Sequence, residues 1–175
     1  MESSDGQPLP FSDWCFVCGD GNPYGLQGRF YRDGSRTYLV VTPRREFNGY
    51  EGILHGGIAA GLLDETMGWA AALAVNRMCV TAEITVRYLA RVPVERRLVV
   101  VADPVKISKR LCTVESELRE STSAAPKLTD EGDGVLARAT GKFIPLSWEE
   151  TVSIDAKLIY EPNMSRVFKP STEPP

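Results

Sequence analysis

The longest apolar stretch of the chain predicts a single helix from about Gly56 to Val75. Apolar residues follow one another along this stretch, and one acidic pair, Asp64 and Glu65, lies in its middle. The first residues, His55-Gly56-Gly57, carry almost no bulk, so another molecule can approach the backbone closely there. We therefore expect a long core helix whose beginning is open to a ligand.

Strand-like runs lie on both sides of this helix. The predicted strands are residues 28–31, 35–42, 79–89, 97–105, 111–120 and 135–144. The first two form a hairpin around Arg32-Asp33-Gly34, and Trp148 to Ile154 predicts a short helix. One long helix followed by consecutive strands favours an α+β fold, with an antiparallel sheet packed on the helix.

The two ends of the chain differ in composition from its middle. Residues 1–13 are polar and contain prolines, which predicts a flexible N-terminal segment. Residues 14–155 are expected to form one domain, and residues 156–175 an extended proline-containing tail. A length of 175 residues suits one domain with a sizeable core.

Composition and charge exclude several classes of function. A net charge of −3 and an isoelectric point near 5.3 give no electrostatic case for nucleic-acid binding. No apolar run approaches the length of a membrane span, and the N-terminus does not resemble a signal peptide, so we expect no membrane partner. The four cysteines are interpreted as reduced thiols of a cytoplasmic protein rather than as a disulfide framework.

Small residues share one face of the predicted helix with a carboxylate. Positions i, i+4, i+7, i+11 and i+15 form one stripe, whereas Glu65 lies about 100° around the helix from Asp64. The stripe consists of Gly57, Gly61, Asp64, Gly68 and Ala72. Unpaired N–H groups at the helix start, together with a lone carboxylate, are the parts needed to hydrolyse an acyl group. The same pattern also fits a core helix whose Asp64 and Glu65 face solvent at one edge.

Three segments of the chain resemble the hotdog-fold acyl-CoA thioesterases of the PaaI-like class. They are Asn48 to Gly57 followed by Asp64, the run from Cys15 to Gln27 with its Cys-Phe-Val-Cys-Gly start, and Thr81 to Tyr88. This resemblance implies a sheet wrapped around the central helix and assembly as a homodimer or a dimer of dimers. It also implies hydrolysis of an acyl-CoA to the free acid and CoA, with no cofactor and no metal.

The expected catalytic residues are Asp64, Gly57 and Gly56. The Gly57 N–H, with the Gly56 N–H, would polarise the thioester carbonyl, and Asp64 would activate water or attack directly. Gly56 and Asp64 are eight residues apart, which is about 12 Å along one helix, whereas a general base must reach within about 3 Å. We therefore expect Asp64 to act on a substrate bound by the partner chain of a two-fold dimer.

Further residues are candidates for substrate binding rather than for the chemical step. They are Asn48, His55, Gly61, Met67, Gly68 and Thr81. The small and apolar members predict a hydrophobic acyl group, medium-chain or aryl. For His55 we favour a role in orienting the preceding loop over proton transfer. The lone Cys15-x-x-Cys18 spacing is a weak metal signal because no second close pair follows it.

Two other classes of function remain open on the sequence. A hotdog hydratase or dehydratase uses a similar scaffold, but it relies on a histidine and a carboxylate at a different spacing. A non-catalytic acyl-CoA-binding protein would bind the same ligand without turnover, because a fold does not fix a function.

Overall fold

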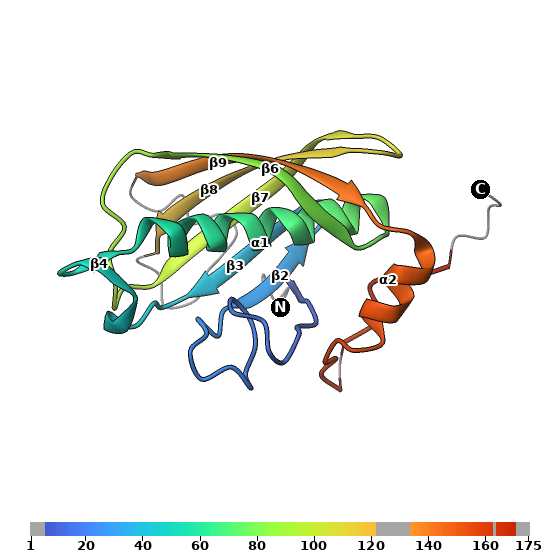
Figure 1. The fold of residues 1–175 in the computed structure, drawn as a ribbon, viewed down its shortest axis with the longest axis horizontal. Helices are drawn as coiled ribbons and strands as arrows, with labels where there is room; N and C mark the ends of the chain where they lie inside the picture. The colour runs from blue at the N-terminus through green and yellow to red at the C-terminus, as the bar shows by residue number, and fades with distance from the viewer. Residues whose placement is uncertain (1–5, 122–133, 163, 171–175) are drawn as a thin grey trace, which may run out of the picture.

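The computed structural model describes residues 6–121, 134–162 and 164–170. Within them, a 7-stranded antiparallel sheet has the order β1-β2-β3-β7-β8-β9-β6. Its strands are β1 Gln7–Pro8, β2 Arg29–Asp33, β3 Arg36–Val41, β6 Cys79–Tyr88, β7 Leu98–Ile107, β8 Cys112–Glu120 and β9 Val135–Pro145. Helix α1, Gly56–Val75, lies against one face of this sheet (Figure 1). The predicted α+β architecture, an antiparallel sheet around one long helix, is confirmed.

Three smaller elements complete the described structure. A 3-10 turn, η1 Arg45–Phe47, leads into a short ribbon of β4 Asn48–Tyr50 and β5 Ile53–Leu54. The second helix, α2 Trp148–Asp155, follows the last strand of the sheet. Its N-terminus has a capping box, in which Ser147 and Glu150 each satisfy a backbone N–H of the other.

Helix α1 begins and ends where the sequence predicts, and local chemistry explains both boundaries. The His55 side chain caps the N-terminus by accepting from the Gly57 N–H. At the C-terminus, Asn76 adopts a left-handed conformation with φ of 52°, and its N–H bonds to the carbonyls of Ala72 and Leu73. Asparagine is one of the few residues that tolerate this conformation, so it ends the helix there.

The length and composition of α1 correct the expectation that no apolar run approaches the length of a membrane span. This helix of 20 residues, with a mean hydropathy of 1.3 over its most apolar stretch, is by these two measures alone sufficient to cross a membrane. Half of that stretch is nevertheless buried inside the protein. Leu62, Leu63 and Met67 have no exposed surface and pack into the core. The helix is apolar because the sheet curves around it.

Strand β6 forms one edge of the sheet and is its least covered strand. It pairs with β9 on one side, and no strand among the described residues pairs with its other side. Val80 and Tyr88 on this strand are about half exposed, at 47% and 49%. A strand of 10 residues with a free edge is a template for pairing with another chain.

Parts of both terminal segments pack on the sheet and α1 within the described residues, and the predicted domain boundaries stay a prediction. Strand β1 pairs with β2, and Leu9 and Phe11 are buried. At the other end, Ile159 forms a β-bridge to Phe11, and Phe168 stacks on Trp69. The prolines that suggested loose ends are compatible with a short edge strand and with extended chain that packs on a core. The sequence also predicts a long polar loop over residues 121–134, with the acidic cluster Asp130, Glu131 and Asp133, and most of this loop lies outside the described residues.

Candidate active site

The neighbouring acidic residues of α1 point to different parts of the protein. Thr81 on β6 donates a hydrogen bond of 2.9 Å from its hydroxyl to Oδ1 of Asp64. Glu65 faces the N-terminal turn instead, where its Oε1 lies 3.5 Å from the sulfur of Cys15. The structure thus joins Asp64 to Thr81 and separates it from Glu65, in the arrangement expected from the helical stripe.

The start of α1 holds one free backbone donor, and it differs from the one that the sequence favours. The Gly57 N–H donates to Nδ1 of His55 at 3.0 Å, so the side chain of His55 already occupies it. The N–H groups of Ile58 and Ala59 donate to the His55 carbonyl. Among the described residues, the Gly56 N–H has no hydrogen-bond partner. The Gly57 N–H is thus occupied by a side chain, and an oxyanion role for either glycine stays a prediction.

His55 and Tyr88 fix the position of this free donor. Because Nδ1 of His55 accepts from Gly57, the neutral ring carries its proton on Nε2, and the side chain serves as a helix cap. This contact agrees with the orienting role favoured for His55. Tyr88 on β6 donates from its hydroxyl to the Gly56 carbonyl at 2.5 Å. Tyr88 was not predicted, and its position on the strand after the helix is the only sequence signal for it.

The ribbon of β4 and β5 brings Asn48 next to the start of α1. Asn48 pairs with Leu54, and the His55 N–H donates to the carbonyl of Phe47 at 2.9 Å. The side-chain oxygen of Asn48 is buried and has no hydrogen-bond partner within the described part of the chain. A buried amide oxygen without a partner costs about 1–3 kcal/mol, so this atom is suited to accept from a water or a ligand.

A cavity of about 270 Å³ lies beside Asp64, between α1, the N-terminal turn and the segment that follows α2. Asp64 and Thr81 form its polar edge, and Gly68 borders it without a side chain. Its apolar wall consists of Trp69, Ala72, Met78, Ile154 and Leu158. The sequence predicts the contribution of the helix, but not that of residues 154–158, because that segment shares no motif with the helix.

Four of the six predicted substrate-binding residues do not border this cavity, namely Asn48, His55, Gly61 and Met67. Met67 has no exposed surface, and a side chain at Gly141 would meet its terminal methyl group, so Met67 belongs to the core beneath β9. Its predicted role in substrate binding stays a prediction. Gly61 is partly exposed and has open space around its Cα. The predicted residues thus form two groups on one chain, one at the helix start and one at its middle, about 12 Å apart along the axis.

A second cluster of ionisable groups lies behind the cavity. A hydrogen bond from the thiol of Cys18 lowers the pKa of Cys15 to about 6, against the effect of burial, and backbone N–H groups of Cys18 and Val17 add to this. The same contact raises the pKa of Cys18. Burial, followed by the neighbouring Cys15, raises the pKa of Glu65 to about 8. The Cys15 thiol donates to Oε1 of Glu65 at 3.5 Å, so one hydrogen bond joins the two groups.

Residues 51–126, which include α1 and strands β6 to β8, match the family model of the thioesterase superfamily. The chain has the hotdog fold, and it is similar to this superfamily over the matched segment. The matched segment contains Gly56, Asp64 and Thr81, so both groups of candidate residues lie within it. No match was found among curated proteins.

Several solved structures share this fold at low sequence identity. The thioesterase superfamily protein RHA08564 is 22% identical with a TM-score of 0.65, and the match covers 75% of this chain but only 60% of that longer one. The E. coli PaaI protein from the phenylacetic acid degradation operon is 15% identical, with a TM-score of 0.59 over 70% of this chain and 81% of its own. The smu.793 protein of Streptococcus mutans, solved with acetyl CoA bound, is 16% identical, with a TM-score of 0.58 over 69% and 89%.

Proposed function

We propose that this protein is a thioesterase that hydrolyses an acyl-CoA with a hydrophobic acyl group to the free acid and CoA. The observation that carries the proposal is the contact between Asp64 and Thr81 at the edge of a cavity whose wall is largely apolar. A carboxylate held by a hydroxyl next to an acyl-sized cavity suits a base or nucleophile beside a bound thioester. The match of residues 51–126 to the thioesterase superfamily model and the acetyl-CoA-bound structure of smu.793 support the same substrate class.

In the proposed reaction, the Gly56 N–H donates to the thioester carbonyl oxygen as negative charge develops on it. The dipole of α1 adds to this stabilisation because the donor lies at the helix N-terminus. Asp64 either removes a proton from the attacking water or attacks the carbonyl carbon to form an anhydride, which water then hydrolyses. CoA leaves as the thiol. Thr81 orients the Asp64 carboxylate, and the Asn48 side chain accepts from the water or from the substrate.

This reaction requires two chains. Gly56 and Asp64 of one chain are eight positions apart on a straight helix, about 12 Å along its axis, which is beyond hydrogen-bond reach of one carbonyl. The free edge of β6 offers the surface for a two-fold partner, since antiparallel pairing of two such edges continues the sheet. A homodimer in which Asp64 of one protomer serves a thioester at Gly56 of its partner forms two equal sites.

The cavity indicates which part of the substrate this chain would bind. Its apolar wall and its position next to Asp64 fit the acyl group, medium-chain or aryl, and Gly68 leaves room for it. No strongly basic cluster lines this cavity, and Lys157 is the one cationic residue among the described residues that border it. The CoA phosphates therefore lie outside the cavity. The four free thiols agree with action in the reducing cytoplasm.

A panel of acyl-CoAs of graded length, with release of free thiol as the readout, tests this proposal. We expect turnover with medium-chain or aryl substrates and weaker turnover with acetyl-CoA. Binding of the same substrates without thiol release would favour a non-catalytic acyl-CoA-binding protein. Hydrolysis limited to short polar acyl-CoAs would contradict the assignment of the cavity to a hydrophobic acyl group.

A further inference from the structure

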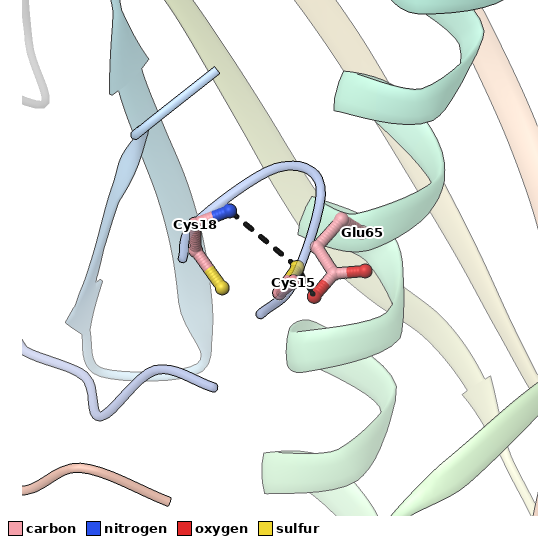
Figure 2. A group of neighbouring side chains, drawn as sticks. All are labelled: Cys15, Cys18 and Glu65. Atoms are coloured by element: carbon pink, nitrogen blue, oxygen red, sulfur yellow. Dashed lines mark hydrogen bonds between the residues drawn. The ribbon is translucent and has the colours of Figure 1, made fainter. Parts of the chain in front are cut away.

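Two cysteines of the N-terminal turn and one glutamate of α1 converge into a compact cluster (Figure 2). The sulfur atoms of Cys15 and Cys18 and a carboxylate oxygen of Glu65 all lie within 4.8 Å of one another. Cys18 is buried, and Cys15 and Glu65 are half-buried. The cluster joins segments 50 residues apart in sequence, and neither the sheet nor the Asp64 site requires it.

The backbone of the turn is arranged around the Cys15 sulfur. The N–H groups of Val17 and Cys18 donate to this sulfur at 3.3 and 3.4 Å. These two donors favour a thiolate, which is the form of cysteine that binds metals. They also fold the Cys-x-x-Cys segment so that its second sulfur lies on the same side as the first, as Figure 2 shows.

In the part of the chain that the structure describes, no basic side chain forms an ion pair with Cys15, Cys18 or Glu65. Within the described residues, Glu65 forms no ion pair, and its only hydrogen-bond partner is Cys15. The nearest guanidinium contact is with backbone, from Arg29 to the Cys18 carbonyl at 3.3 Å. A buried carboxylate is normally paired with a cation or bound to a metal. Two sulfur ligands and one carboxylate form a donor set for a thiophilic divalent ion rather than for Mg²⁺ or Ca²⁺.

We propose that Cys15, Cys18 and Glu65 bind one Zn²⁺ ion that fastens the N-terminal turn to α1. With Zn–S distances of about 2.3 Å in a tetrahedral site, the two sulfurs would lie about 3.8 Å apart, so the cluster has to contract by no more than about 1 Å. Cys18 and Glu65 both border the cavity, which leaves the fourth position open to water. The ion would help to position Asp64, because it holds Glu65, the next residue of α1.

This proposal opposes the sequence-based expectation of no metal, and the reason is the origin of the third ligand. A lone Cys-x-x-Cys spacing is a weak signal because a zinc site needs at least one further ligand. Glu65 supplies this further ligand from the middle of an apolar helix, and it lies too far along the sequence from the two cysteines to belong to a short motif. Folding alone brings the carboxylate to the two sulfurs.

Metal titration of the full chain tests the proposal with readouts that do not depend on turnover. Reduced, chelator-stripped protein is titrated with Zn²⁺, and the metal retained per chain after desalting is measured by mass spectrometry. A parallel titration with Co²⁺ reports sulfur coordination through thiolate-to-cobalt charge-transfer absorption. We expect one ion per chain, a charge-transfer band, and a higher melting temperature with Zn²⁺ present.

Single substitutions then assign the ligands, and the other two cysteines provide matched controls. Cys15→Ser and Cys18→Ser should lose stoichiometric Zn²⁺ and the cobalt band, and Glu65→Gln should weaken binding by at least about 10–100-fold. Cys79→Ser and Cys112→Ser should bind as the wild type does, although Cys79 borders the same cavity. Circular dichroism of the metal-free variants separates loss of the site from loss of the fold.

Three outcomes would overturn the proposal. The first is a reduced wild type that remains metal-free at saturating Zn²⁺. The second is retention of one ion per chain in Cys18→Ser, or its loss in Cys79→Ser. The third is a wild type in which Cys15 and Cys18 form a disulfide that does not exchange for metal under reducing conditions, which would make the pair a redox element.

Discussion

Thr81 on β6 donates a hydrogen bond of 2.9 Å to the carboxylate of Asp64 on α1. The same strand reaches the start of the helix through the Tyr88 hydroxyl, which contacts the Gly56 carbonyl. Strand β6 therefore fixes both ends of the proposed chemistry, the carboxylate and the segment that holds the free N–H. No described strand pairs with its other edge, so a partner chain that pairs there would adjoin both groups.

Replacement of Asp64 by asparagine should abolish turnover while leaving the dimer intact. We expect Asp64→Asn to lower kcat by two or more orders of magnitude, since a positioned base contributes roughly 10²–10⁴-fold. Asparagine is nearly isosteric and can still accept from Thr81, so folding and substrate binding should persist. Steady-state hydrolysis of the best acyl-CoA and sedimentation of the variant measure both properties.

The neighbouring Glu65→Gln is the matched control for this experiment, because Glu65 faces the Cys15 turn. Its effect on kcat should be smaller than that of Asp64→Asn. A larger loss of kcat in Glu65→Gln than in Asp64→Asn would identify Glu65 as the catalytic carboxylate. Full activity in both variants would place it outside α1.

The free N–H of Gly56 can be removed without changing the helix. Proline is favoured at the first helical position, where its missing N–H breaks no helical bond. The preceding His55 has φ −59° and ψ 132°, a conformation that proline permits before it. We expect Gly56→Pro to lower kcat by about 10²–10³-fold, as loss of one oxyanion donor does.

Gly56→Ala is the control, since it adds a Cβ but keeps the N–H. That Cβ would lie 3.5 Å from the Tyr88 hydroxyl, an ordinary contact. The alanine variant should retain most of its activity. Equal losses in the two variants would mean that space, rather than the N–H, matters at this position.

Narrowing of the cavity should change the acyl preference. A Cβ at Gly68 would lie 3.7 Å from the Phe143 ring, so alanine fits the fold at a position that borders the cavity. We expect Gly68→Ala to lower kcat/KM for the largest accepted acyl-CoA by about tenfold or more, because one methyl group in a pocket is worth about 1–3 kcal/mol. Shorter acyl-CoAs should be affected less. Gly61→Ala, on the same helix but away from the cavity, is the control, and a uniform loss across acyl lengths would contradict the assignment.

Glu117 on the sheet should give a pH-dependent contribution to stability. Burial would raise the pKa of Glu117, but hydrogen bonds and charges of Arg119 and Arg138 outweigh it and hold this pKa below the ordinary value of 4.5. A lowered folded-state pKa stabilises the protein above 4.5, and this contribution is lost as pH falls through the lowered value.

We therefore expect Glu117→Gln to reduce the free energy of unfolding at neutral pH by about 0.2–1 kcal/mol. The effect is small because solvent screens the charges at this partly exposed site. The difference from wild type should shrink as pH falls below 4.5. Urea unfolding at several pH values measures it, and Arg138→Gln, which removes one of the two donors, should show the same trend with a smaller amplitude. A difference that is constant with pH would exclude the carboxylate as its cause.

The sequence predicts the elements of this fold well because their signals are local. The helix Gly56–Val75 has a capping residue at each end, and the strands are bounded by turns and charged residues. The termini were predicted less well, since Leu9, Phe11 and Phe168 lie in polar, proline-containing segments. Their burial depends on surfaces that exist only after the sheet and α1 have formed.

The same distinction holds for the candidate site. The stripe that contains Asp64 and Gly68 follows from helical periodicity, and both residues border the cavity. The contacts of Gly57, Met67 and Tyr88 were not readable in the same way. Side-chain rotamers and the path of β6 decide these contacts, and residue spacing in the sequence does not predict them. They are the side-chain cap at Gly57, the core position of Met67 and the strand contact of Tyr88.

A mixture of two inactive variants should recover activity if the site is shared between chains. In a heterodimer of Asp64→Asn and Gly56→Pro chains, one site combines the intact Gly56 of the first chain with the intact Asp64 of the second. The other site has neither group. Random association makes half of the dimers mixed, each with one working site of two, so about a quarter of wild-type activity should return.

Co-expression of the two variants with different affinity tags, followed by tandem purification, isolates the mixed dimer for this measurement. The isolated mixed dimer should reach about half of the wild-type activity per dimer, one site of two being intact. The double variant Asp64→Asn/Gly56→Pro co-expressed with wild type is the matched control. Its mixed dimer carries one lesion in each site and should be nearly inactive. If both groups acted within one chain, the outcomes would reverse: the two single variants would give no recovery, and the control would keep half of its activity through the intact wild-type chain.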